Sequence, residues 1–87
     1  MATVWIPSLM RTLTDGKPQV EAAGATVRDL LENLEASFPG VRSRLCEGDR
    51  LRPDMAVAVD GQIQIGGLRA PVQSGSEVHF LPAVSGG

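Results

Sequence analysis

A single amphipathic segment over residues 27–38 constrains most strongly what this chain can fold into. Its apolar residues recur at the spacing of one helical face. Thr26 supplies an N-cap hydroxyl and Asp29 follows at the capping-box position, which predicts a helix that begins at Val27 and ends at Pro39-Gly40. One helix buries only one stripe, so another layer must cover it. The residues expected on that stripe are Val27, Leu30, Leu31, Leu34 and Phe38.

Alternating apolar residues before the helix predict a pair of strands. Residues 3–11 alternate in the manner of a strand, with Val4 and Ile6 on one face. Asp15-Gly16 is a turn signal, and Gln19–Ala22 after it is expected to return as the second strand of a hairpin.

The segments after the helix predict further strands. Residues 41–47 are expected to add one helical turn. Met55–Val59 is a continuous apolar run that predicts a buried strand, and the turn signal Asp60-Gly61 closes it. Residues 63–65 alternate as a short edge strand, and residues 78–82 are expected to form the last strand.

The order of these elements predicts an α+β fold. At 87 residues the chain has room for one core, which buries about 60 to 65% of the surface of the unfolded chain. A mixed sheet of four to five strands, covered on one face by one main helix, accounts for all of the elements. With the first and last strands parallel neighbours, this is the ubiquitin-like β-grasp. We expect residues 1–82 to form the β-grasp domain and residues 83–87 a flexible C-terminal tail.

Composition excludes several classes of function. No stretch approaches the roughly 20 apolar residues of a membrane span, and the start lacks the pattern of a secretory signal, so a cytoplasmic protein is expected. The net charge of −2 and sequence pI of about 5.2 do not suit a nucleic-acid binder. The three aromatic residues, Trp5, Phe38 and Phe80, are too few for a base-stacking surface.

No catalytic or metal-binding group of residues emerges from the pattern. Cys46 is the one cysteine, so no internal disulfide or paired-cysteine metal site can form, and a partly buried, inert thiol is expected. His79 is the one histidine and has no recognisable nucleophile and acid beside it. Gly66-Gly67 lacks the lysine and helix cap of a phosphate loop, so a plain turn is expected. The sequence therefore predicts neither an enzyme nor a bound cofactor or metal.

The last residues are the strongest functional signal. Pro82 cannot continue a strand ladder, so the residues after it should leave the domain as an extended peptide. Gly86 and Gly87 lack a Cβ, so they could enter a channel too narrow for other residues. We interpret the carboxylate of Gly87 as the reactive group. The alternative is a frayed end without function.

These features resemble the ubiquitin-like sulfur carrier proteins, the family of ThiS, MoaD and CysO. The resemblance covers nearly the whole chain, and the tail is its specific part. Within the family, the Ile6-Pro7 start and residues 81–84 are most similar to CysO. The segments that carry the resemblance are Val4–Pro7, Thr26–Leu31, Val57–Gly61 and Phe80–Gly87.

The resemblance implies a chemistry for Gly86 and Gly87. In the family, a ubiquitin-activating-type adenylyltransferase uses ATP to adenylate the terminal glycine, and the acyl-adenylate then accepts sulfur to give a thiocarboxylate. The carrier is thus a protein cosubstrate rather than an enzyme, with ATP used by the activating enzyme. The implied partners are that adenylyltransferase, a sulfur-acceptor enzyme and a metalloprotease that releases the product, with no nucleic acid or membrane.

The resemblance leaves the pathway open. A cysteine synthase-like acceptor is favoured, while a thiazole synthase-like acceptor (ThiS type) and a molybdopterin synthase-like one (MoaD type) are alternatives. A ubiquitin-like modifier, which forms conjugates with lysines, would use the same adenylation step. A β-grasp interaction module that ignores its tail is the third possibility.

Alternation also predicts a surface for partners. Trp5 on the first strand and His79 and Leu81 on the last should point away from the helix, next to the root of the tail. A contiguous apolar patch of this kind is typical of an interface. The alternative is that Trp5 only covers a sheet edge or packs under a loop. The residues expected to contact partners are Trp5, His79, Leu81, Pro82, Ala83, Val84 and Ser85.

Overall fold

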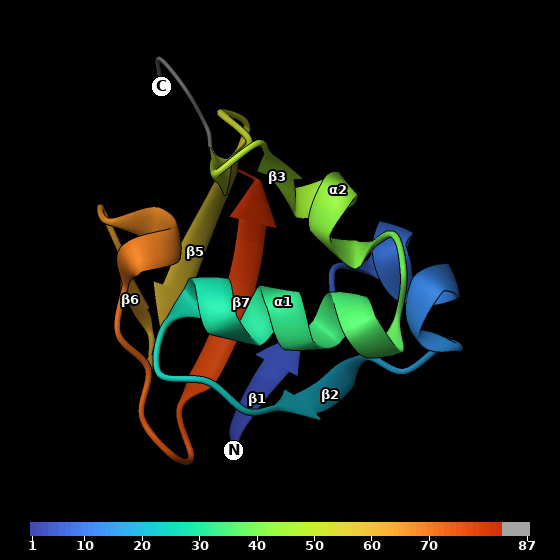
Figure 1. The fold of residues 1–87 in the computed structure, drawn as a ribbon, viewed down its shortest axis with the longest axis horizontal. Helices are drawn as coiled ribbons and strands as arrows, with labels where there is room; N and C mark the ends of the chain where they lie inside the picture. The colour runs from blue at the N-terminus through green and yellow to red at the C-terminus, as the bar shows by residue number, and fades with distance from the viewer. Residues whose placement is uncertain (83–87) are drawn as a thin grey trace.

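The computed structural model describes residues 1–82, and the predicted tail at 83–87 lies outside the described residues. A five-stranded mixed sheet, in the order β2-β1-β7-β5-β6, forms one layer, and helix α1 crosses one face of it (Figure 1). The sheet strands are β1 Ala2–Trp5, β2 Gln19–Ala22, β5 Met55–Val59, β6 Gln62–Ile63 and β7 Glu77–Pro82. The other elements are η1 Ser8–Thr14, α1 Val27–Ser37, α2 Val41–Leu45, β3 Cys46–Glu47, β4 Arg50–Leu51 and η2 Gly67–Arg69.

The central strands β1 and β7 lie side by side and run parallel, with Trp5 paired to His79. The other pairs of this sheet are antiparallel. The start of β1 and the arrowhead of β7 therefore lie at opposite ends of the sheet (Figure 1). The predicted α+β, β-grasp fold is confirmed.

Helix α1 forms from the local signals that predicted it. The Thr26 hydroxyl accepts a hydrogen bond of 3.2 Å from the Asp29 N–H, and the Asp29 carboxylate accepts one from the Ala25 N–H. Four of the five predicted apolar residues are buried, and Phe38 is half-buried against the same core. The core between helix and sheet includes Val4, Leu30, Leu31, Leu34, Val57, Val78 and Phe80.

The turn between β5 and β6 also follows from local chemistry. Asp60 and Gly61 have φ angles of 51° and 85°, which the two-residue turn of a type I′ hairpin requires. The Asp60 carboxylate accepts hydrogen bonds from the Glu77 N–H at 2.9 Å and the Ser76 hydroxyl at 3.0 Å. One aspartate thus fixes this hairpin against the start of β7.

The prediction of a strand over residues 3–11 is wrong beyond Trp5. β1 ends there, and the 3₁₀ helix η1 follows, with the Met10 N–H bonded to the Pro7 carbonyl at 2.8 Å. Pro7 has no N–H for the ladder. Within η1, Met10 and Thr14 are both buried. The hairpin of β1 and β2 still forms, across a longer connection than a tight turn.

Two further segments differ from the predictions. The helical turn at 41–47 is shorter, because α2 ends at Leu45 and Cys46 enters the small β3–β4 sheet. The edge strand at 63–65 is displaced to Gln62–Ile63, and Ile65 lies outside it, fully exposed. The short pairing follows from the tight turn, which places Gln62 opposite Val59 directly after it.

Candidate functional site

The site is built around the end of β7, where the predicted tail begins. β7 pairs with β5 as far as Pro82, which stands opposite Met55. Val78 and Phe80 are buried in the core, while Leu81 and Pro82 are exposed, as the alternation predicts for all but the last position. β7 lies between β1 and β5 in the sheet, and beyond His79 its residues pair with β5 alone.

Trp5 and His79 form a stacked pair close to this end. Their ring centroids lie 5.3 Å apart with planes inclined by 7°, because paired residues of β1 and β7 point to the same face. The indole N–H of Trp5 donates a hydrogen bond of 3.0 Å to the Glu77 carboxylate. Both rings are half-buried on the face opposite α1. The predicted outward placement of Trp5 and His79 is confirmed.

An apolar surface extends from this pair across the outer face. Strand register places one row of side chains across β1, β7, β5 and β6, and a second row pairs Leu81 with Ala56. Leu81 is 38% exposed and Ile63 is 58% exposed. We call this surface the tail-end patch, and its residues are Trp5, Ala56, Ala58, Ile63, His79 and Leu81.

The sequence pattern did not assign three members of the tail-end patch to a partner surface: Ala56, Ala58 and Ile63. The available signal was the Asp60-Gly61 turn, because a two-residue hairpin places Ile63 directly opposite Ala58. Ala58 is buried although it lies on the outer face, between the neighbouring side chains of His79 and Ile63. The centre of the patch is therefore occupied by a small side chain between two larger ones.

The opposite end of the outer face is polar. Thr3 is paired with both Glu21 and Glu77, and its hydroxyl donates a hydrogen bond of 2.6 Å to the Glu21 carboxylate. Apolar side chains are therefore concentrated at the end of the sheet at which β7 stops. A macromolecule seated on the patch would lie next to the point where the chain passes Pro82.

Cys46 has the surroundings of a structural thiol. It is 5% exposed, and burial raises the pKa of its thiol, which outweighs the lowering effect of Arg42 and Arg28. A thiol with a raised pKa is a weak nucleophile at neutral pH. Within residues 1–82, no group of three or more His, Cys, Asp or Glu side chains could hold a metal ion, and no helix is long and apolar enough to cross a membrane.

The predicted tail residues Ala83, Val84, Ser85, Gly86 and Gly87 lie outside the described residues. Comparison with known proteins does extend over them, because the ThiS family profile matches residues 4–87. The chain belongs to the ThiS family. The resemblance inferred from the sequence is confirmed.

Individual relatives agree with this family. The sulfur carrier protein CysO of Mycobacterium tuberculosis is 34% identical over 90 aligned positions, which cover 98% of this chain and 97% of CysO. A chain from the crystal structure of the Amycolatopsis orientalis BexX/CysO complex matches with a TM-score of 0.91 and 38% identity, with full coverage of both chains. Small archaeal modifier protein 3 of Haloferax volcanii is 34% identical over 65 positions, which cover 72% of this chain and 71% of that protein.

Proposed function

We propose that this ThiS-family protein is a sulfur carrier whose Gly87 carboxylate is adenylated and then converted to a thiocarboxylate. The observation that carries the proposal is the match of the family profile through residue 87, together with identity to the carrier CysO over nearly its full length. Gly86 and Gly87 are the residues that this chemistry needs, because their lack of side chains allows close approach by an enzyme.

The chemistry explains why the carrier depends on a partner. A carboxylate is a poor electrophile, so its oxygen first attacks the α-phosphorus of ATP, which releases pyrophosphate and leaves an acyl-adenylate. A sulfur nucleophile then attacks the acyl carbon, AMP leaves, and the C–S bond gives the thiocarboxylate. Both steps occur in the activating enzyme, so the carrier acts as a protein cosubstrate and not as a catalyst.

The folded domain supplies recognition. The tail-end patch is an apolar surface beside Pro82, to which Leu81 adds exposed apolar area. Trp5 is of a residue type that is enriched among the residues that contribute most to binding between proteins. An enzyme seated there would receive residues 83–87 in its active site. The proposed partners are an adenylyltransferase and a sulfur-acceptor enzyme, and the BexX/CysO complex is a structural precedent for a CysO bound to another protein.

We favour an acceptor in cysteine synthesis, because this chain is 34% identical to the sulfur carrier CysO over nearly the full length of both chains. Thiazole synthase-like and molybdopterin synthase-like acceptors remain alternatives within the same chemistry. A metalloprotease that releases the product is a further proposed partner.

Adenylation is tested by pyrophosphate release in the presence of the adenylyltransferase encoded by the same organism. Addition of the carrier and ATP should release pyrophosphate in proportion to the carrier, and a chain that lacks Gly87 should release none. Equal release from the shortened chain would overturn the proposal. Residues 1–82 are unchanged in that variant, so a thermal melt equal to that of the parent confirms that its fold is intact.

A second candidate function is a ubiquitin-like protein modifier. The observation that favours it is the 34% identity to small archaeal modifier protein 3 over 72% of this chain. Both functions begin with adenylation, but in a modifier the acyl group of Gly87 ends as an amide on a lysine. Expression of tagged carrier in the source organism separates them, since a modifier gives lysine-linked conjugates that resist a thiol reductant, whereas a carrier gives none.

A further inference from the structure

A cleft lined by arginines lies on the helix side of the sheet, next to the tail-end patch, with which it shares Ala56. Its volume is about 710 Å³, and its walls come from β4, the loop that follows it, η2 and the first turn of α1. Four arginines contribute to the lining, and Asp49 is the only acidic residue among the lining side chains. We call it the arginine cleft. The arginines are Arg28, Arg50, Arg52 and Arg69.

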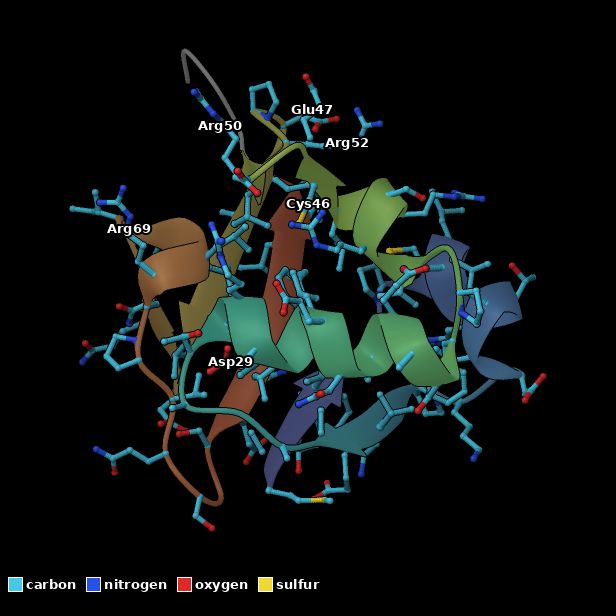
Figure 2. The ribbon with its side chains drawn as sticks, in the orientation of Figure 1. Asp29, Cys46, Glu47, Arg50, Arg52 and Arg69 are labelled. Carbon is cyan, nitrogen blue, oxygen red and sulfur yellow. The ribbon has the colours of Figure 1, made fainter. Side chains whose placement is uncertain are left out.

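Two of these arginines already make contacts within the domain. Arg28 donates a hydrogen bond of 3.3 Å to the Asp49 carbonyl, and Arg52 pairs with Glu47 at 3.4 Å (Figure 2). Arg50 and Arg69 are exposed, and neither forms an ion pair within residues 1–82. Figure 2 shows both side chains projecting outward at the periphery of the molecule. The cleft is thus positive on a chain whose net charge is −2.

Apolar side chains also contribute to the lining. Ile65 is fully exposed at the cleft, which is unusual for so large an apolar side chain, and Leu51 and Met55 are only half-buried beside it. An apolar side chain from a bound molecule would cover this surface. Met55 is also the residue paired with Pro82, so the cleft reaches the same end of the sheet as the root of the tail.

The backbone of the cleft does not suit a phosphate group. A phosphate-binding loop offers several free N–H groups, but the N–H groups of Gly67, Arg69 and Ala70 already donate to the Gln64, Gly66 and Gly67 carbonyls. The charge instead comes from separate side chains on β4 and η2, next to exposed apolar side chains. This arrangement fits an extended acidic segment better than a compact anion.

From these observations we infer that the arginine cleft docks an acidic protein segment that carries an apolar side chain. Its carboxylates pair with Arg50 and Arg69, while its apolar side chain covers Ile65. The segment belongs to the adenylyltransferase that receives the tail. The identity of that partner rests on the proposed function; the affinity for an acidic segment does not.

A labelled peptide with a central leucine flanked by glutamates serves as the probe, and fluorescence anisotropy measures its binding. The double variant Arg50→Glu/Arg69→Glu should bind about tenfold more weakly than the parent. The matched control Lys17→Glu/Arg44→Glu makes the same change in net charge at two exposed residues outside the cleft and should bind as the parent does. All four positions are exposed, and thermal melts verify that each variant is folded.

Three further results complete the test. Binding should weaken as salt is raised. It should also weaken several-fold for the variant Ile65→Ser and for a probe with serine in place of leucine. Equal affinity of the two double variants for the peptide would overturn the inference. Displacement of the peptide by inorganic phosphate at the same concentration would also overturn it, because such competition indicates a site for small anions.

The two proposals can fail separately. A chain that lacks Gly87 should bind the peptide as the parent does, although it cannot be adenylated. If the parent binds the peptide but releases no pyrophosphate with the adenylyltransferase, the proposed function fails alone. If Arg50→Glu/Arg69→Glu is adenylated with the KM of the parent, the docking inference fails alone.

Discussion

Leu81 provides a test of the tail-end patch at the scale of one residue. Its side chain is exposed on the outer face, so Leu81→Asp should leave the melting temperature within a few degrees of the parent. Affinity for the adenylyltransferase should fall by about tenfold or more, because a charge would lie in an apolar contact. Titration calorimetry measures the affinity. Leu9→Asp, at another exposed leucine, is the control and should retain it.

Trp5 tests the same surface with a different balance of effects. Its indole stacks on His79 and bonds to Glu77, so Trp5→Ala removes contacts within the fold as well as a surface for partners. If Trp5 contacts the adenylyltransferase, Trp5→Ala should lower the affinity for that enzyme by a larger factor than it lowers the folding equilibrium constant. Paired titrations and thermal melts compare the two. Reduced stability with unchanged affinity would show that Trp5 serves only the fold.

Glu35 gives the fold a dependence on pH. Its carboxylate accepts hydrogen bonds from the Arg42 and Gly40 N–H groups, and these lower the pKa of Glu35 below its ordinary value of 4.5. A lowered folded pKa means that the stabilisation is present above pH 4.5 and is lost as the pH falls through the folded pKa. The stability gap between the parent and Glu35→Gln should therefore shrink below pH 4.5, as urea titrations would show. A gap that widened there would contradict this role.

At the scale of one element, α1 holds the sheet through a stripe of leucines. Leu34 is 2% exposed in the core, so Leu34→Ala should cost about 2 to 5 kcal/mol of unfolding free energy. A small domain has a total of about 5 to 15 kcal/mol. Urea denaturation measures the loss. Leu9→Ala, at a leucine that is 86% exposed, is the control and should change stability by less than about 0.5 kcal/mol.

The same element shows what a sequence can predict. The Thr26 cap, the leucine stripe and the Asp60-Gly61 turn act over a few residues, and each forms as predicted. Gly24 shows the limit, because a Cβ there would lie 2.6 Å from the Cβ of Asp29 and 2.9 Å from the Leu30 nitrogen. This close contact of Gly24 with the first turn of α1 depends on the path by which the chain enters the helix. No pattern in the sequence indicates that path.

Long-range contacts decided the segments that were predicted incorrectly. Residues 8–11 were predicted to continue the first strand, yet they lie in η1, where Met10 and Thr14 are buried. The arginine cleft was also missed. Arg28, Arg50 and Arg69 are far apart in the sequence, and only the packing of α1 against η2 and the small sheet brings them together.

At the scale of the whole molecule, two surfaces of different chemistry reach the end of the sheet at which β7 stops. The tail-end patch is apolar and lies on the outer face, while the arginine cleft is positive and lies on the helix side. Leu81 belongs to the first surface, and Met55, the partner of Pro82 in the sheet, lines the second. An enzyme that contacted both the tail-end patch and the arginine cleft would bind the domain on two sides of Pro82. Contact on two sides would fix the orientation of the domain relative to the enzyme.

Mass spectrometry of the intact protein shows directly whether sulfur is carried on Gly87. The carrier is incubated with the adenylyltransferase, ATP and a sulfur source, and the product is then fragmented. In the C-terminal fragment that contains Gly87, one oxygen should be replaced by one sulfur. We expect this mass change both in the parent and in Cys46→Ala. Sulfur added at Cys46, or a mass that remains unchanged after pyrophosphate has been released, would contradict it.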